Sequence, residues 1–211
     1  MSRTRDHFSA ISHLLGALLS IAGLVVLVVF AARRSLPWHV VGFCIFGASL
    51  ILLYTASATY HILRIGSRAR RVMRRVDHSL IYVLIAGTYT PICLTALRGP
   101  WGWTLFGLTW GLAIAGILVK AFWPVRGWVS TLYYIAIGWL AVIAFVPLTR
   151  TVSHTGLFWL VLGGVCYTVG AGCYGLDATY PSDRWFNLHD LFHLLVLAGS
   201  ASHFMLMLAL V

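Results

Sequence analysis

The chain alternates long apolar stretches with short charged segments. Seven long stretches contain no Asp, Glu, Lys or Arg. About 20 apolar residues in a helix cross the hydrocarbon core of a bilayer, and only self-bonded backbone can cross it. Each stretch therefore predicts a membrane-spanning helix, at residues 8–32, 38–63, 77–97, 101–122, 127–148, 156–176 and 188–210. The expected fold is all-α, a single transmembrane domain of seven helices over residues 1–211.

Composition favours lipid rather than water as the solvent. The chain is 60% hydrophobic and only 9% charged, and its mean hydropathy is +0.90. A soluble domain of this length does not bury so much apolar surface. The first stretch exceeds the roughly 7–15 residues of a signal-peptide core, so we expect it to be retained as a span. The sequence predicts a multi-pass protein of the plasma (inner) membrane.

The net charge of +10 bears on topology rather than on nucleic-acid binding, which we do not expect. With a cytosolic N-terminus, eleven of the 15 basic residues fall in cytosolic segments and four outside. This distribution follows the positive-inside rule, so the N-terminus is expected in the cytosol and the C-terminus outside. The segment Arg64–Arg75 either anchors this topology or binds anionic lipid headgroups.

Glycines on two expected spans predict close helix packing. Gly107 and Gly111 lie one turn apart, and a second cluster runs from Gly163 to Gly172. Small residues let helix backbones approach each other in a membrane. The sequence leaves the oligomeric state open, and a homo-oligomer is compatible with it.

The few ligand-type side chains fall at span ends that face the same side of the membrane. His189 and His193 are four residues apart and share a helix face. Alone, such a pair is equally compatible with two packed histidines. The predicted topology brings His61, at the end of the second span, to the same depth. Three histidines with one coordination position open are typical of a catalytic zinc site.

Asp77 and Ser57 are expected beside this cluster. Asp77 begins the third span on the same side and could be a fourth ligand, or a base that holds a bound water. Ser57 lies one turn before His61. Its hydroxyl could bond that water or the Asp77 carboxylate, or else the backbone carbonyl four residues earlier.

The other polar residues in the spans are expected to have lesser roles. His13 could support the site from the first span. His203 lies about 15 Å along the helix from His193, too far to join the ligands, and is expected to be buried and hydrogen-bonded. His78 is about 100° round the helix from Asp77 and is expected to face elsewhere. Asp190 is expected to pair with an arginine such as Arg184.

At these residues the chain resembles the hemolysin III family, the bacterial branch of the progestin and adipoQ receptor superfamily, which is related to alkaline ceramidases. The matching stretches are SHLLGALLSIAGLVVLV (12–28), SATYH (57–61), DHSLIYVLIAGTYTP (77–91) and HDLFHLLVLAGSASHF (189–204). The resemblance implies seven membrane helices, zinc on His61, His189 and His193, and Asp77 and Ser57 beside the bound water. Members often carry acidic residues before the first span, whereas this chain has only Asp6 there.

Two functions remain open from the sequence. In the first, the protein is a zinc-dependent hydrolase of a lipid amide or ester, with Asp77 as the proton acceptor and Ser57 steadying the metal-bound water or an oxyanion. In the second, zinc is structural, and the protein is a non-enzymatic sensor or regulator of membrane homeostasis, or a cytolytic protein of the haemolysin type. A membrane lipid is the expected substrate or ligand. A retinal protein is excluded because Lys120, the only lysine, lies at the end of the fourth span.

Overall fold

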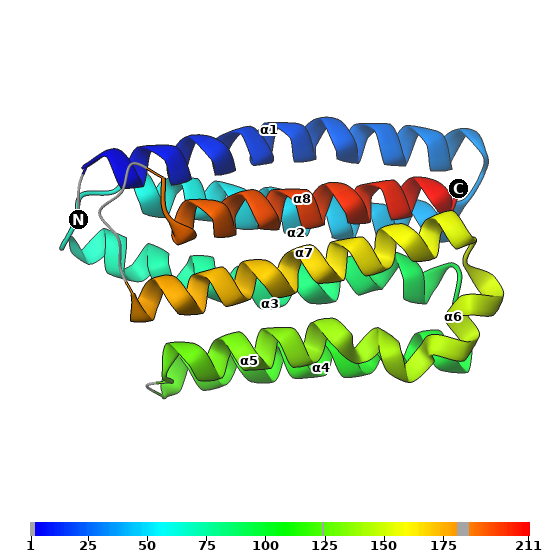
Figure 1. Cartoon of the computed structure of the whole chain (residues 1–211). Coiled ribbons are helices and arrows are strands. Elements are labelled where there is room, and N and C mark those ends of the chain that lie inside the picture. Colours follow the sequence, from blue (N-terminus) through cyan, green and yellow to red (C-terminus); the bar gives the residue numbers. More distant parts are fainter. Residues whose placement is uncertain (1–2, 124, 181–185) are drawn as a thin grey trace.

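The structure is a computed structural model that describes residues 3–123, 125–180 and 186–211. Every element formed by these residues is a helix, and the helices lie side by side along one axis (Figure 1). The start of the first helix and the end of the last lie at opposite ends of this bundle. In chain order the elements are α1 (Arg3–Arg33), α2 (Pro37–Ile62), α3 (Arg68–Leu94), α4 (Pro100–Phe122), α5 (Gly127–Gly138), the 3-10 helix η1 (Trp139–Ala144), α6 (Phe145–Thr151), α7 (His154–Thr179) and α8 (Leu188–Ala209).

Six segments of the described chain are long and apolar enough to cross a membrane. They are His7–Arg33, Pro37–Ile62, Pro100–Phe122, Gly127–Thr151, His154–Thr179 and Leu188–Ala209. The protein is therefore a multi-pass helical membrane protein. Helix α3 has 27 residues, enough to span, but its first part is too polar for it to be counted with the six.

Helix α3 begins nine residues before the expected span, at Arg68 instead of residue 77. The Ser67 side chain accepts a hydrogen bond from the backbone N–H of Arg70, which caps the helix. The charge-free run marks only the apolar part of this helix. Arginine is a good helix former, so the basic residues that precede the run extend the helix beyond it.

The fifth expected span, 127–148, is one apolar segment but not one regular helix. It breaks at η1 between α5 and α6. Tyr89 of α3 reaches into the break: its hydroxyl donates to the carbonyl of Gly138 at 2.6 Å and accepts from the backbone N–H of Ala141 at 2.7 Å. A side chain inserted into the backbone ladder is an established cause of helix distortion. Here the Tyr89 hydroxyl also provides hydrogen-bond partners for the Gly138 carbonyl and the Ala141 N–H, which lipid could not bond.

Helices α2 and α8 are the most buried of the six candidate spans. Of their apolar windows, 56% and 44% are buried, against 17–28% in the other candidate spans. A buried polar contact joins them at mid-height, where the Tyr54 hydroxyl lies 2.6 Å from Ser200 Oγ. Tyr167 of α7 bonds the same serine at 2.9 Å. The three metal-ligand candidates, His61, His189 and His193, come from these two helices.

The glycine predictions are confirmed in one place and wrong in another. A Cβ at Gly163 would overlap the ring of His203, so this glycine permits close packing of α7 against α8. Gly107 and Gly111 instead have nothing within 4 Å of an added Cβ and are exposed on α4. They pack against no helix in the described chain. The motif spacing alone does not say which face of α4 the bundle covers.

Candidate metal centre

Three histidines meet where α2 ends and α8 begins. One ring nitrogen from each of His61, His189 and His193 lies within 4.8 Å of the others. The Nε2 atoms of His189 and His193 are 3.1 Å apart. In tetrahedral zinc sites with Zn–N bonds of 2.0–2.1 Å, ligand nitrogens are about 3.4 Å apart. The three ring nitrogens are thus near enough to one another that they could hold a single metal ion.

The start of α8, which carries two of these histidines, is held by a capping box. The Asn187 side chain accepts hydrogen bonds from the backbone N–H groups of His189 and Asp190. In return Asp190 Oδ2 accepts from the backbone N–H and the side-chain amide of Asn187. This exchange satisfies N–H groups that a helix start otherwise leaves unpaired. It fixes the first turn of α8 and hence the direction of His189.

Asp190 therefore has a role that the sequence analysis did not predict. It is 1% exposed, and its other oxygen, Oδ1, accepts from the Ser9 hydroxyl of α1 at 3.3 Å. The expected partner, Arg184, lies outside the described residues. The sequence signal was available, because Asn187 and Asp190 have the spacing of a capping box.

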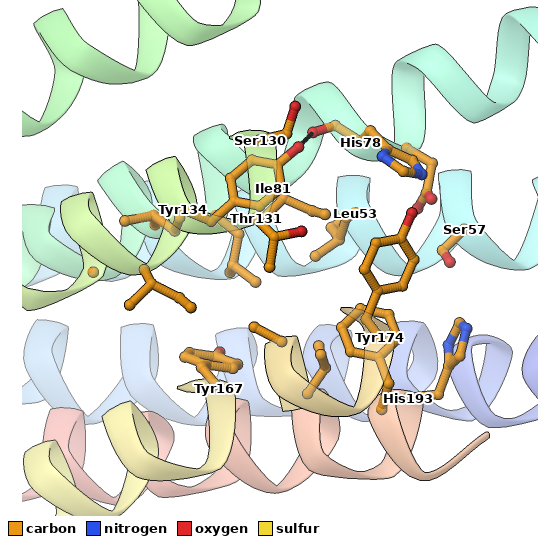
Figure 2. Close-up of a pocket in the computed structure, with 18 of the residues that line it drawn as sticks. Leu53, Ser57, His78, Ile81, Ser130, Thr131, Tyr134, Tyr167, Tyr174 and His193 are labelled. Carbon is orange, nitrogen blue, oxygen red and sulfur yellow. Dashed lines mark hydrogen bonds between the residues drawn. The ribbon is translucent and has the colours of Figure 1, made fainter. Parts of the chain in front are cut away.

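Ser57 and Asp77 lie side by side next to the histidines. The Ser57 hydroxyl, 2% exposed, lies close enough to the Asp77 carboxylate to influence it. Asp77 is not part of the three-histidine group but lines the same cavity, with the cations of Lys120 and Arg74 near its carboxylate. Ser57 faces the cavity across from His193 (Figure 2).

A cavity of about 290 Å³ runs from the histidines into the bundle. The polar groups Asp77, Ser57 and the three histidines lie at one end, and Gly138, Gly164 and His203 line it farther along the helices. Between them the wall is largely aliphatic and aromatic, with contributions from Leu53, Ile81, Leu84, Ile85, Ile135 and Val196. An ionisable cluster at the end of an apolar cavity is the arrangement expected of a binding site.

His203 lies along this cavity and is not a ligand, as expected. It is 5% exposed, and its Nδ1 lies 2.8 Å from the carbonyl oxygen of Gly199. A carbonyl only accepts, so Nδ1 carries the proton. The ring stacks on Tyr167 with 5.3 Å between centroids and 12° between planes. The prediction of a buried, hydrogen-bonded histidine is confirmed.

The prediction that His78 faces elsewhere is wrong. It lines the cavity, and Lys120 Nζ lies 3.1 Å from its Nδ1. Lys120 also donates to the Tyr134 hydroxyl at 3.1 Å, which in turn donates to the His78 carbonyl at 2.8 Å. Figure 2 shows His78 and Tyr134 beside the cavity. The cavity faces a wide arc of α3, so a 100° offset from Asp77 does not remove a side chain from it.

Part of the basic segment Arg64–Arg75 stabilises the α2–α3 connection. Arg70 is buried at 8% exposure, donates to the carbonyl of Leu63 at 2.8 Å and lies over the ring of Tyr60 at 4.8 Å. Arg71 donates to the Gly66 carbonyl at 2.6 Å. These two arginines hold the connection next to His61, and all three contacts are with protein groups.

The chain is similar to known proteins over most of its length. Residues 1–204 match the family described as "Haemolysin-III related". A "Hemolysin-3" from Bacillus cereus is 43% identical over 198 residues, which are 93% of this chain and 87% of that protein. A "Hemolysin-3 homolog" from Bacillus subtilis (strain 168) is 42% identical, over 93% of this chain and 89% of that protein. At 25% identity, the "ADIPOR-like receptor IZH2" of Saccharomyces cerevisiae matches 83% of this chain and 60% of its own length.

Proposed function

Because the chain belongs to the haemolysin-III related family, we propose that it is a zinc-binding membrane protein that hydrolyses an amide or ester bond of a membrane lipid. The proposal assigns seven spans, α3 included, with the N-terminus in the cytosol and the histidines near the cytosolic face of the inner membrane. Two features support the seventh span. Helix α3 lies among the other helices, and the bundle has its first and last helix ends on opposite sides (Figure 1).

The donor set fits zinc. His61, His189 and His193 offer three neutral imidazole nitrogens within reach of one ion, and imidazole is a preferred ligand of Zn²⁺. Three protein ligands leave one tetrahedral position open, as in catalytic zinc sites. Zinc, when bound there, would polarise a substrate carbonyl and acidify a coordinated water. We assign the three histidines this binding role.

Asp77 would accept and return the proton, and Ser57 would orient its carboxylate. The Asp77 carboxylate lies beside the cluster and outside the three-histidine group, so an oxygen of this carboxylate could take a proton from the attacking water. The Ser57 hydroxyl lies beside the same carboxylate and would hold it in one orientation by donating a hydrogen bond. Asp77 then returns the proton to the leaving amine or alcohol.

The single observation that carries the lipid assignment is the shape and lining of the cavity. Its polar end holds the histidines, Ser57 and Asp77, and its aliphatic wall continues to Gly164 and His203. Small-molecule cavities occupy roughly 300–1,000 Å³, and about 290 Å³ is close to this range. An acyl chain fits such a wall, with its amide or ester bond at the polar end.

The test compares zinc content and turnover in the detergent-purified protein and in Asp77→Asn. Turnover is the release of fatty acid from a fluorescent ceramide and from a fluorescent phospholipid. We expect Asp77→Asn to keep its zinc and to lose at least about 10²-fold in rate, because general-base catalysis typically contributes 10²–10⁴-fold. Asp177→Asn is the matched control: this acid lies on α7 but does not line the cavity.

Other outcomes would refute parts of the proposal. If Asp77→Asn loses its zinc, Asp77 is a ligand and the site is a closed, structural one. Wild-type protein that holds zinc but releases no fatty acid from either substrate would contradict the hydrolase assignment. It would leave the non-enzymatic regulator with structural zinc.

A further inference from the structure

Helix α1 contacts the metal-bearing turn of α8 through two polar side chains. Ser9 and His13 are four residues apart, so they share one face of α1. Ser9 donates to Asp190, and His13 Nε2 lies 2.7 Å from Nδ1 of His193. His13 is 3% exposed and lines the cavity. The first contact reaches the helix cap and the second reaches a candidate ligand.

The contact with His193 fixes how protons are arranged when a metal is bound. Nε2 of His193 faces Nε2 of His189, 3.1 Å away, on the side where the ion would sit. A coordinating imidazole nitrogen offers its lone pair, so the proton of the neutral ring must be on the other nitrogen. For His193 that nitrogen is Nδ1, and its nearest hydrogen-bond partner is His13. His13 Nε2 must then be the acceptor.

We propose that His13 is a positioning residue of the metal site, holding His193 in the tautomer that leaves Nε2 free to bind zinc. The inference rests on the zinc site proposed above. The groups that bind a ligand histidine's second nitrogen are usually carboxylates, carbonyls or water. Here the partner is an imidazole from a third helix. This assigns α1 to a site whose ligands come from α2 and α8.

The surroundings of His13 hold its ring against His193. The ring packs edge-on against Tyr54, with 4.9 Å between centroids and 70° between planes. Tyr54 is itself fixed by the hydrogen bond from its hydroxyl to Ser200 of α8. Nδ1 of His13 is buried with no hydrogen-bond partner among the described residues. Among the described residues, Nε2, which faces His193, is therefore the nitrogen of His13 that has a hydrogen-bond partner.

A purely structural role for His13 makes a different prediction. If the residue only held α1 against α8, then losing the Ser9–Asp190 bond, which joins the same two helices, would have a similar effect on the site. If it positions the ligand, metal affinity depends on an acceptor at the Nε2 position and not on the number of contacts between the helices. Glutamine can place its amide oxygen near the Nε2 position of histidine, whereas phenylalanine fills the space without an acceptor.

The experiment measures zinc affinity of the full-length protein in detergent by competition with a chromophoric chelator. The variants are His13→Phe, His13→Gln and Ser9→Ala, each with a thermal melt to report stability. We expect about 10–100-fold weaker zinc binding in His13→Phe, the usual loss when a ligand's hydrogen-bond partner is removed. His13→Gln should keep most of the affinity. Ser9→Ala should melt earlier and bind zinc as the wild type does.

Two results would overturn the proposal. Unchanged zinc affinity in His13→Phe would remove any positioning role. Equal losses in His13→Phe and His13→Gln, in step with their melting temperatures, would make His13 a packing residue. Wild-type protein that binds no zinc would instead refute the zinc site itself, and the positioning role with it. The failure of this inference and that of the proposed function are therefore distinguishable.

Discussion

Two adjacent glycines on α7 should respond to the same substitution in opposite ways. At Gly163 an added Cβ would overlap Cε1 and Nδ1 of the His203 ring. At Gly164 an added Cβ has nothing within 4 Å, and the residue lines the cavity. We therefore compare Gly163→Ala with Gly164→Ala. The pair holds the chemical change constant and alters only what the new methyl group meets.

The size of each stability change depends on whether the side chains around the new methyl group can move away from it. The ring of His203 is held by its bond to Gly199 and by its stack on Tyr167. Overpacking costs about 1–3 kcal/mol, and losing the hydrogen bond costs about 1 kcal/mol. Alanine recovers about 0.8–1.0 kcal/mol of helix propensity at either position. We expect Gly163→Ala to lower the free energy of unfolding by about 1–3 kcal/mol and Gly164→Ala to raise it by up to about 1 kcal/mol.

The assay is thermal unfolding of both variants in one detergent, followed by circular dichroism. A change of 1 kcal/mol shifts the melting temperature by roughly 2–4 °C for a chain of this size, so the two variants should differ by about 5–10 °C. Equal melting temperatures, or a more stable Gly163→Ala, would refute the packing of His203 against α7.

Three further predictions test the cavity, the helix cap and the helix break. Gly164→Leu should fill the cavity and abolish fatty-acid release with zinc content unchanged, while Gly172→Leu, exposed on the same helix with open space around it, should leave both as in the wild type. Asn187→Ala should lower stability by about 1 kcal/mol, measured by the same melt, because it removes the cap of α8. Tyr89→Phe should cost about 1 kcal/mol, since two hydrogen bonds in a membrane contribute about 0.6 kcal/mol each, and unchanged melting would contradict its role in the break.

The apolar stretches predicted the helices well because membrane helices must be self-satisfied and apolar. They failed where the cause lay in another part of the chain. The break after Gly138 depends on the hydroxyl of Tyr89, which comes from a different helix. The early start of α3 depends on Ser67 and on arginines, which a search for uncharged residues excludes by design.

The candidate metal site was predictable because its spacing is local. His189 and His193 share a helix face by sequence alone, and topology brings His61 to their level. The contacts of Lys120 with His78 and of His13 with His193 were not predictable in detail. They depend on which faces of neighbouring helices meet, and helix packing rather than periodicity decides this.

The most direct test of the account is the zinc content of the detergent-purified wild-type protein beside His193→Ala. His203→Ala is the matched control, since it removes a buried histidine of the same helix that is outside the three-histidine group. We predict about one zinc per chain in the wild type and in His203→Ala, and none in His193→Ala. No zinc in the wild type, or equal zinc in His193→Ala, would contradict the three-histidine site.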